Sequence, residues 1–321
     1  MTTRHLIDPD LIQALEMLPS FDFNQDVLPM IRIGFAAQFA SAEVPDSPDV
    51  ETSAASVTGI DGNPIGLLIH APLAPSSAAR PAVLHIHGGG YIIGSAAMST
   101  LSNRAMAVAA DCVIVSVDYR LSPETPHPGP VEDCYSALCW LHDNAASLGV
   151  DPARMAVMGE SAGGGLAAGL ALLARDRAKV KLVHQHLIYP MLDDRTCTRA
   201  PNPLAGEFVW TPASNHFGWS SLLGQPPGGE GVSPYAAAAR VEDVRGLPST
   251  FIYVGALDLF VDEDVAYAMR LLRAGVPTEL HLFPGATHAF EVALDSPLAK
   301  NALRISTQAL RRALHPSDGS G

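Results

Sequence analysis

The chain has 321 residues, of which 48% are hydrophobic and 17% are charged, and its formal net charge is −13. This composition predicts a globular protein with a well-filled core. The negative charge, with no Lys/Arg cluster longer than a pair, argues against nucleic acid or an anionic membrane surface as a partner.

Membrane insertion is not expected, because no stretch reaches about 18 uninterrupted apolar residues. The nearest stretch, 162–174, is rich in Ala and Gly and predicts a buried helix. The N-terminus lacks a basic start followed by an apolar region, so we expect a cytoplasmic protein rather than a secreted one. Four cysteines show no CxxC spacing and are predicted to be reduced, buried thiols: Cys112, Cys134, Cys139 and Cys197.

The first 50 residues mix helical and loop-like patterns that fit no element of a sheet layer. From about residue 56, short β-rich runs alternate with helical patterns, which predicts a mostly parallel sheet with helices on both faces, the α/β class. The sheet domain is expected to cover residues 51–192 and 240–315. Its predicted strands are 65–70, 82–87, 113–118, 155–158, 182–189, 251–254 and 279–283.

Residues 193–239 interrupt this alternation and are predicted to be a cap insertion over a pocket at the sheet edge. The segment is bounded by loops rich in Pro and Gly. The alternative is that its aromatic side chains only complete the core. The tail, 316–321, is predicted to be disordered. The candidate pocket residues are Phe208, Trp210, Phe217, Trp219 and, from the N-terminal segment, Phe39.

A serine stands at the centre of the pattern Gly159-Glu160-Ser161-Ala162-Gly163, which follows the apolar run 155–158 and precedes a helical run. Strand, tight turn and helix in this order favour a nucleophile elbow, in which small neighbours let a strained turn expose the serine hydroxyl. The alternative is an ordinary Gly/Ser turn at the end of a strand.

A serine hydroxyl needs a base to accept its proton and a third group to orient that base. Asp258 follows the strand 251–254, and His288 lies in the loop after the strand 279–283. Both should project from the sheet edge that carries Ser161. Other acids fit less well: Glu160 is expected to point along the turn, and residues 262–264 are expected to supply negative charge to a helix N-terminus.

No metal site and no cofactor are predicted. His85 and His87, like His184 and His186, lie two residues apart within strands, but a metal would need a third ligand and an open position. The run 163–168 matches G-x-G-x-x-A, yet three residues separate it from the strand, and no acid ends the next strand. These glycines are better explained by close packing of the helix on the sheet.

The run His87-Gly88-Gly89-Gly90 directly follows the strand 82–86. Attack of a serine on a carbonyl creates an oxyanion, and backbone N–H groups in such a glycine loop can approach it closely. We therefore expect the loop and the N–H after Ser161 to face one reacting carbonyl.

With these motifs in order, the chain resembles the hormone-sensitive-lipase-like branch of the α/β-hydrolase carboxylesterases, the bacterial family IV group. The resemblance covers roughly residues 55–315. It rests on the segments 87–90, 118–124 (Asp-Tyr-Arg-Leu-Ser-Pro-Glu), 159–164, 258–263 and 288–290.

The resemblance implies an α/β-hydrolase catalytic domain with a helical cap, which is built from an N-terminal cap segment (residues 1–50) and the cap insertion (193–239). It also implies hydrolysis of short acyl esters without a cofactor. It is also compatible with a homodimer. Ligand binding by a hydrolase-like receptor, and action on amides, lactones or formamides, stay open as alternatives. The implied roles are nucleophile for Ser161, base for His288, orienting acid for Asp258, and an oxyanion hole formed by Gly88, Gly89, Gly90 and Ala162.

Two segments depart from the family pattern. Many relatives carry Asp or Thr where this chain has Glu160, and the tract after Glu124 is only loosely similar. Tyr119, Arg120 and Glu124 are interpreted as structural, with Arg120 and Glu124 pairing with each other or with nearby carbonyls.

Overall fold

The computed structural model describes residues 2–17, 21–41 and 46–316, and it confirms the predicted α/β architecture. An eight-stranded sheet has the order β1-β2-β4-β3-β5-β6-β7-β8. β2 runs antiparallel to β1 and β4, and the remaining neighbours are parallel. The strands are β1 (Val50–Thr58), β2 (Pro64–Pro72), β3 (Arg80–Ile86), β4 (Val113–Asp118), β5 (Val150–Glu160), β6 (Leu182–Ile188), β7 (Ser249–Gly255) and β8 (Thr278–Phe283).

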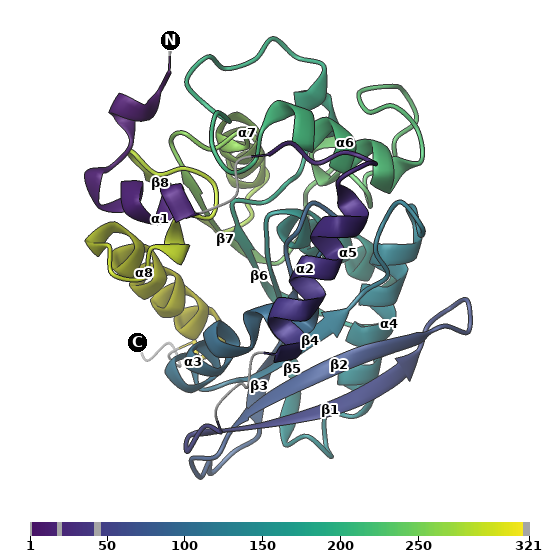
Figure 1. Ribbon diagram of the computed structural model, residues 1–321. Helices are drawn as coiled ribbons and strands as arrows, with labels where there is room; N and C mark the ends of the chain where they lie inside the picture. Colours follow the sequence, from purple (N-terminus) through teal and green to yellow (C-terminus); the bar gives the residue numbers. More distant parts are fainter. Residues whose placement is uncertain (1, 18–20, 42–45, 317–321) are drawn as a thin grey trace.

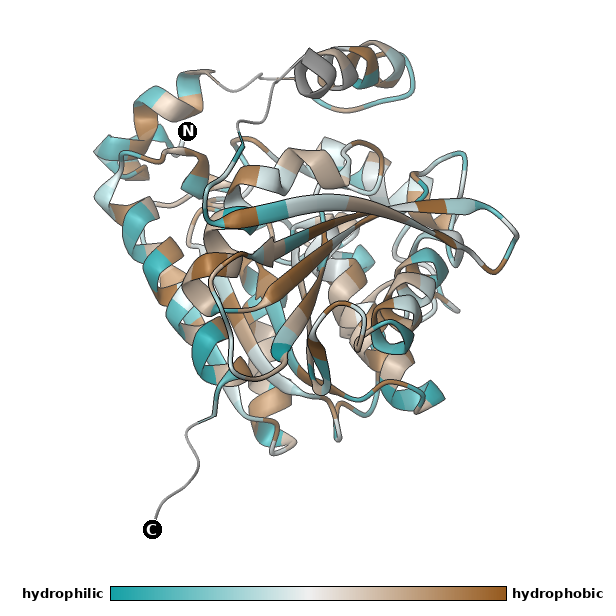
Figure 2. Cartoon of the chain, turned by 90° about the horizontal axis from the view of Figure 1, so that it is seen from below, coloured by the Kyte–Doolittle hydropathy of each residue, from teal (hydrophilic) through white to brown (hydrophobic). Residues whose placement is uncertain are grey.

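Helices cover both faces of this sheet (Figure 1). α3 (Thr100–Ala110) and α8 (Pro297–Leu314) pack against each other on one face, and α4 (Gly129–Asp143) and α5 (Ala162–Arg177) do so on the other. Side chains alternate along a strand, so β3 supplies both layers: Leu84 joins the α4 and α5 core, whereas Val83 joins the α3 and α8 core. Figure 2 accordingly shows apolar residues concentrated along the central strands.

The seven predicted strands are all present, but β1 was missed by the sequence analysis. Its residues are mostly small or polar, and only Val50 in it is buried. β1 hydrogen-bonds to β2 alone, at the edge of the sheet, so it needs no apolar alternation.

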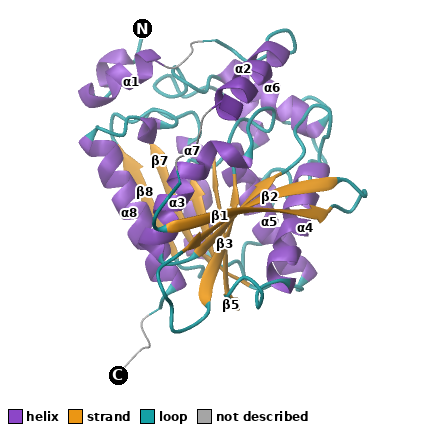
Figure 3. Ribbon diagram, turned by 60° about the horizontal axis from the view of Figure 1, so that its bottom comes forward, coloured by secondary structure: helices purple, strands orange, loops and turns teal. Residues whose placement is uncertain are grey.

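The N-terminal segment and the 193–239 segment lie together. α2 (Leu28–Ser41) and α6 (Pro212–Leu223) are side by side in Figure 3. Phe217 of α6 packs against a cluster that includes Leu28 and Ile31 of α2. Arg32 of α2 also donates hydrogen bonds to the carbonyls of Ile92 (2.8 Å) and Ser122 (2.7 Å). α2 is thereby attached to the loop that follows the glycine run 88–90. The side chain of Phe39 and residues 317–321 lie outside the described residues.

The buried histidines of β6 hydrogen-bond to hydroxyl groups and to each other. The Ser249 hydroxyl donates to the Val183 carbonyl, so His184 Nδ1 donates to Ser249 Oγ (2.9 Å). His184 Nε2 lies 3.3 Å from His186 Nδ1, and Ser306 Oγ lies 2.8 Å from His186 Nε2. Burial lowers the pKa of His184 to about 4, because a charged imidazole would lose its hydration there.

This burial predicts an acid-dependent loss of stability from His184. The unfolded chain takes up a proton at this residue below about pH 6.5, whereas the folded protein does so only near pH 4. The contribution is therefore fully present above pH 6.5 and falls as the pH decreases toward 4. Between pH 7 and pH 5, we expect the unfolding free energy of the wild type to decrease by about 2 kcal/mol more than that of His184→Gln.

Urea unfolding of both proteins at pH 7 and pH 5 measures this difference. The comparison has to be made against the variant, because the buried carboxyls of Glu263 and Glu291 have pKa values raised to about 8 and oppose the trend. His5→Gln, at an exposed position, is the matched control. A difference between wild type and His184→Gln that does not change with pH would contradict the expectation.

Candidate active site

The backbone at Ser161 is strained. This residue joins β5 to α5 with φ 56° and ψ −121°, a conformation that is rare for a residue with a side chain. Its glycine neighbours are required by space: a Cβ on Gly163 would lie 2.0 Å from the Ile86 carbonyl oxygen, and one on Gly159 would lie 2.3 Å from that of Gly163. The Gly-x-Ser-x-Gly spacing thus reflects three chain segments packed at backbone contact distance.

The three residues predicted to act with one another are adjacent in the structure. Ser161 Oγ lies 2.9 Å from His288 Nε2, and His288 Nδ1 lies 2.7 Å from Asp258 Oδ2. Their residues are only 6%, 5% and 0% exposed, respectively. The second Asp258 oxygen accepts the Phe260 amide (3.0 Å), which fixes the carboxylate plane toward the imidazole. The three residues follow the ends of β5, β7 and β8, which lie at one edge of the parallel sheet.

Aromatic rings surround the imidazole of His288. Tyr189 meets it edge-on with the ring centroids 4.6 Å apart, and Phe260 does so at 5.3 Å. The ring of Trp210 lies 6.5 Å away. The loop bearing Tyr189 is also bonded to the elbow, because the Ser161 amide donates to Ile188 O and Ser161 O accepts from the Met191 amide, both at 2.9 Å.

The glycine run after β3 lies directly against the elbow. A Cβ on Gly88 would be 3.0 Å from the Glu160 carbonyl oxygen, and Gly89 and Gly90 have φ values of 114° and 61° that favour glycine. Within the described residues, the amides of Gly89, Gly90 and Ala162 donate no hydrogen bond to another group. Ala162 is the first residue of α5, where the helix dipole adds positive potential.

His87 shapes this glycine loop from below. Its Nδ1 donates to the Gly88 carbonyl (2.8 Å), and its ring stacks on Tyr119 with centroids 4.3 Å apart. Burial lowers the pKa of His87 to about 4, so the ring is neutral at pH 7. His87 therefore acts on the shape of the loop and adds no charge.

Glu160 differs from the prediction that it points along the turn. His85 Nε2 donates to both of its carboxylate oxygens, at 3.0 and 3.1 Å. His85 Nδ1 lies 2.9 Å from the Ser116 hydroxyl, which in turn accepts from Asn103. The residue before the nucleophile is thus anchored across β5, β3 and β4 by a polar chain.

The predicted pairing of Arg120 with Glu124 is wrong. Arg120 binds Asp133, with Nε 2.8 Å from Oδ2, and also Asp61. Glu124 pairs instead with Arg32 of α2. The nearer acid for Arg120 comes from α4, a contact that sequence spacing does not reveal.

Residues 262–264 do begin a helix, α7 (Val261–Arg273), as predicted. Glu263, however, is buried, and it accepts the amides of Leu192 (2.6 Å) and Asp193 (3.1 Å). It holds the chain that leaves β6 for the 193–239 segment. This role depends on a contact across 71 residues and was not expected from the sequence.

The candidate pocket residues lie in different surroundings. Trp210 is closest to the candidate site, since a Cβ on Gly90 would lie 2.1 Å from its ring. Phe208 is partly buried and packs against the core cluster that contains Tyr189, and Phe217 packs between α2 and the loop after the glycine run. Trp219 is fully buried, with its ring centroid 5.4 Å from that of Tyr91.

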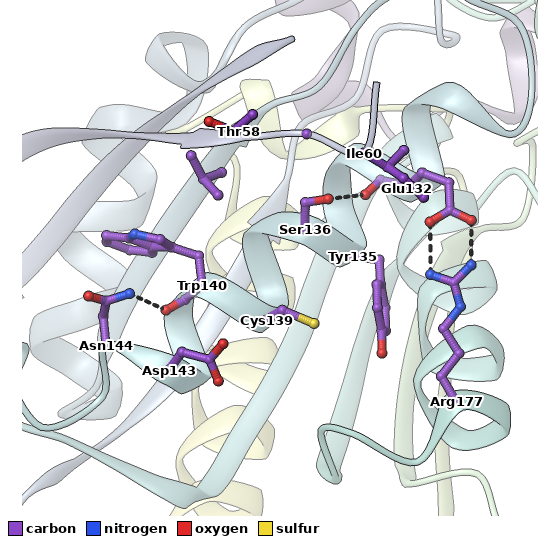
Figure 4. A pocket seen from close by; sticks show the side chains of 12 residues that line it. Thr58, Ile60, Glu132, Tyr135, Ser136, Cys139, Trp140, Asp143, Asn144 and Arg177 are labelled. Atoms are coloured by element: carbon purple, nitrogen blue, oxygen red, sulfur yellow. Dashed lines mark hydrogen bonds and ion pairs between the residues drawn. The ribbon is translucent and has the colours of Figure 1, made fainter. Parts of the chain in front are cut away.

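A hollow of about 450 Å³ lies elsewhere, between α4 and the turn joining β1 to β2 (Figure 4). Several of its polar groups are paired with one another: Arg177 binds Glu132, Ser136 donates to the Glu132 carbonyl, and Asn144 donates to the Trp140 carbonyl. None of its lining residues belongs to the Ser161 site. This hollow therefore adds no chemistry to that site.

Across the described part of the chain, no three His, Cys, Asp or Glu side chains are grouped as a metal would require. Helices in that part are also too short or too polar to cross a bilayer. All four cysteines are unpaired, and Cys139 and Cys197 are half-buried rather than buried as predicted.

A family model described as the alpha/beta hydrolase fold matches residues 83–292. Esterase LipI of Mycobacterium tuberculosis is 33% identical over 316 residues, covering 96% of each chain. The chain belongs to the hormone-sensitive-lipase-like carboxylesterases of the α/β-hydrolase superfamily. Another member, carboxylesterase NlhH of Mycobacterium tuberculosis, is 38% identical and covers 73% of this chain and 74% of its own. A solved bacterial heroin esterase superposes with a TM-score of 0.89 at 38% identity, covering 98% of this chain and 99% of its own.

Gly163→Ala should disrupt the elbow of this esterase, because the added methyl group would overlap the Ile86 and His87 carbonyl oxygens. We expect a loss of about 3 kcal/mol in unfolding free energy and roughly a 100-fold lower kcat/KM for an ester. Gly229→Ala, where a Cβ meets nothing within 4 Å, is the control. Denaturant unfolding and ester turnover measure both effects. Equal stability and activity in the two variants would contradict the packing account.

Proposed function

We propose that this carboxylesterase hydrolyses short-chain acyl esters through a Ser161-His288-Asp258 triad and an acyl-enzyme intermediate. The observation that carries the proposal is the continuous hydrogen-bond chain from Ser161 Oγ through both ring nitrogens of His288 to Asp258 Oδ2. This arrangement supplies a nucleophile, a base within reach of its proton and a group that orients the base.

In the first half-reaction, Ser161 Oγ attacks the ester carbonyl carbon while His288 Nε2 accepts the hydroxyl proton. The tetrahedral intermediate then collapses, the bond to the alkoxy group breaks, and His288 returns the proton to the leaving alcohol. Water attacks the acyl-enzyme by the same route, releasing the carboxylic acid and restoring Ser161. Asp258 stabilises the imidazolium in both halves.

The negative oxygen of each intermediate is proposed to face the amides of Gly89, Gly90 and Ala162. Support comes from their lack of other acceptors in the described chain and from the contact of the glycine loop with the elbow. Loss of one such donor typically costs about 3 kcal/mol of barrier height. Gly88 shapes the loop, because its carbonyl accepts from His87.

Short acyl groups are favoured in this proposal because Trp210 closes the space beside Gly90. Its indole contacts the glycine and is itself held by Nε1 donating to Asn215 Oδ1 (3.2 Å). Phe23 of the N-terminal segment packs on the other side, with ring centroids 5.6 Å apart. We propose that residues 1–50 and 193–239 together form the cap over this pocket.

Replacing the nucleophile tests the proposal. Ser161→Ala should lower kcat for p-nitrophenyl butyrate by at least about 1,000-fold while the fold is retained, because the variant lacks the hydroxyl that lies beside His288 Nε2. Ser102→Ala, on the exposed side of α3, should match wild type. Steady-state turnover measures the effect, and an active Ser161→Ala would refute the assignment.

Trimming the cap tests the substrate pocket. Trp210→Ala should raise the ratio of kcat/KM for p-nitrophenyl octanoate over acetate about 10-fold, since removing the indole makes room for added methylenes. Trp140→Ala is the control, because it removes a tryptophan side chain from the separate hollow of Figure 4 and should leave this ratio unchanged. An unchanged acyl-length profile in Trp210→Ala would exclude it as the limit on chain length.

A further inference from the structure

The carboxyl group of Glu291, which has a buried oxygen, lies near the proposed base and takes no part in the triad. Glu291 follows His288 by three residues, in the 3-10 helix Phe290–Val292. The Tyr189 hydroxyl donates to Glu291 Oε1. The ring of the same tyrosine meets the His288 imidazole at 4.6 Å and 62°. A continuous contact therefore runs from the Glu291 carboxyl through Tyr189 to the imidazole.

Tyr189 lies against the His288 ring, and its backbone is fixed in place. Its amide donates to the Tyr253 carbonyl (2.7 Å), and its backbone has φ 34°, an unusual value for a non-glycine residue. Its neighbours Ile188 and Met191 are both bonded to the backbone of Ser161. A shift of the tyrosine would thus be felt at the nucleophile as well as at the base.

We propose that Glu291 is a positioning residue, which acts through Tyr189 to keep His288 aligned with Ser161. The inference rests on the proposed function, since it presumes that His288 is the base. Glu291 does not touch substrate in this account. Its effect is on the geometry of proton transfer, so it should change kcat more than KM.

The surroundings of Glu291 favour its neutral form. Glu160, at the end of β5, is the acid whose electrostatic interaction acts on Glu291, and its side chain is hydrogen-bonded to His85 of β3. Tyr189 follows β6, and Tyr253 of β7 packs on the adjacent Phe290. Burial, together with the charge of Glu160, raises the pKa of Glu291 to about 8.

Ionisation of Glu291 above about pH 8 would add a second carboxylate charge that interacts with that of Glu160, and one Glu291 oxygen is buried without a hydrogen-bond partner. Because each disfavours the charge of the other, the loop that carries both Glu291 and His288 would be displaced. The sign is therefore a decrease in kcat as the pH rises through about 8. Glutamine keeps an acceptor for the Tyr189 hydroxyl and cannot ionise.

The test compares three variants in p-nitrophenyl butyrate turnover from pH 6 to 9.5. Glu291→Ala and Tyr189→Phe should each lower kcat about 10-fold with KM within two-fold of wild type. The double variant should have the same kcat as either single variant, because both substitutions remove the same hydrogen bond between Tyr189 and Glu291. Glu291→Gln should keep kcat at pH 7 within two-fold and lack the decrease near pH 8 that wild type shows.

Controls separate this inference from the triad itself. Titration with a fluorophosphonate gives the concentration of folded, reactive sites in every variant, and the exposed Glu242→Gln controls for loss of a carboxyl. If Ser161→Ala remained active, the proposed function would fail. If Ser161→Ala were inactive while Glu291→Ala matched wild type in kcat, or Glu291→Gln kept the alkaline decrease, only the role of Glu291 would be overturned.

Discussion

The tight turn at Ser161 is the constraint on which the candidate site depends. Ser161 has φ 56° at the junction of β5 and α5, a strained backbone conformation. Such a conformation is kept only where the surrounding structure holds it in place. Gly159 and Gly163 allow the approach of backbone to backbone, and amides and carbonyls of the β6 loop bond Ser161 on both sides. A strained residue is thus held by packing against the end of β3 and by hydrogen bonds from the end of β6 and the segment that follows it.

The parallel part of the sheet explains why the partners of Ser161 arrive at the same place. β5, β7 and β8 end at one edge, so side chains that are 97 and 127 positions from the serine come within hydrogen-bond distance of it or of each other. A second layer supports this edge. Glu160 is held by His85, His288 is flanked by Tyr189, and Glu263 anchors the chain that leaves β6.

The local sequence was sufficient to predict the motifs of the candidate site. It was not sufficient to predict the contacts that hold these motifs in place. The elbow, the glycine run, Asp258 and His288 could be named because each combines a residue type with a position at the end of a strand. The contact of His85 with Glu160 could not, since it depends on which strands are neighbours and on register between β3 and β5. Arg120 was assigned the wrong acid for the same reason: Asp133 is brought close by packing of α4, not by spacing. β1 escaped notice because an edge strand with small polar residues carries little apolar signal.

Charge is distributed unevenly around this site. The histidines that support the sheet and the glycine loop, His184 and His87, are neutral at pH 7, as are the carboxyls of Glu263 and Glu291, because burial disfavours their charged forms. These groups act as hydrogen-bond donors and acceptors without charge.

The central claim is that Ser161 becomes covalently acylated. Its most direct test is acid quenching of the enzyme within milliseconds of mixing with p-nitrophenyl acetate, followed by peptide mass spectrometry. The account predicts an acetyl group on the peptide that contains Ser161, formed together with a stoichiometric burst of p-nitrophenol. Enzyme that was not mixed with the substrate should carry no acetyl group on this peptide. Acetylation at another residue, or a burst with no modified peptide, would contradict it.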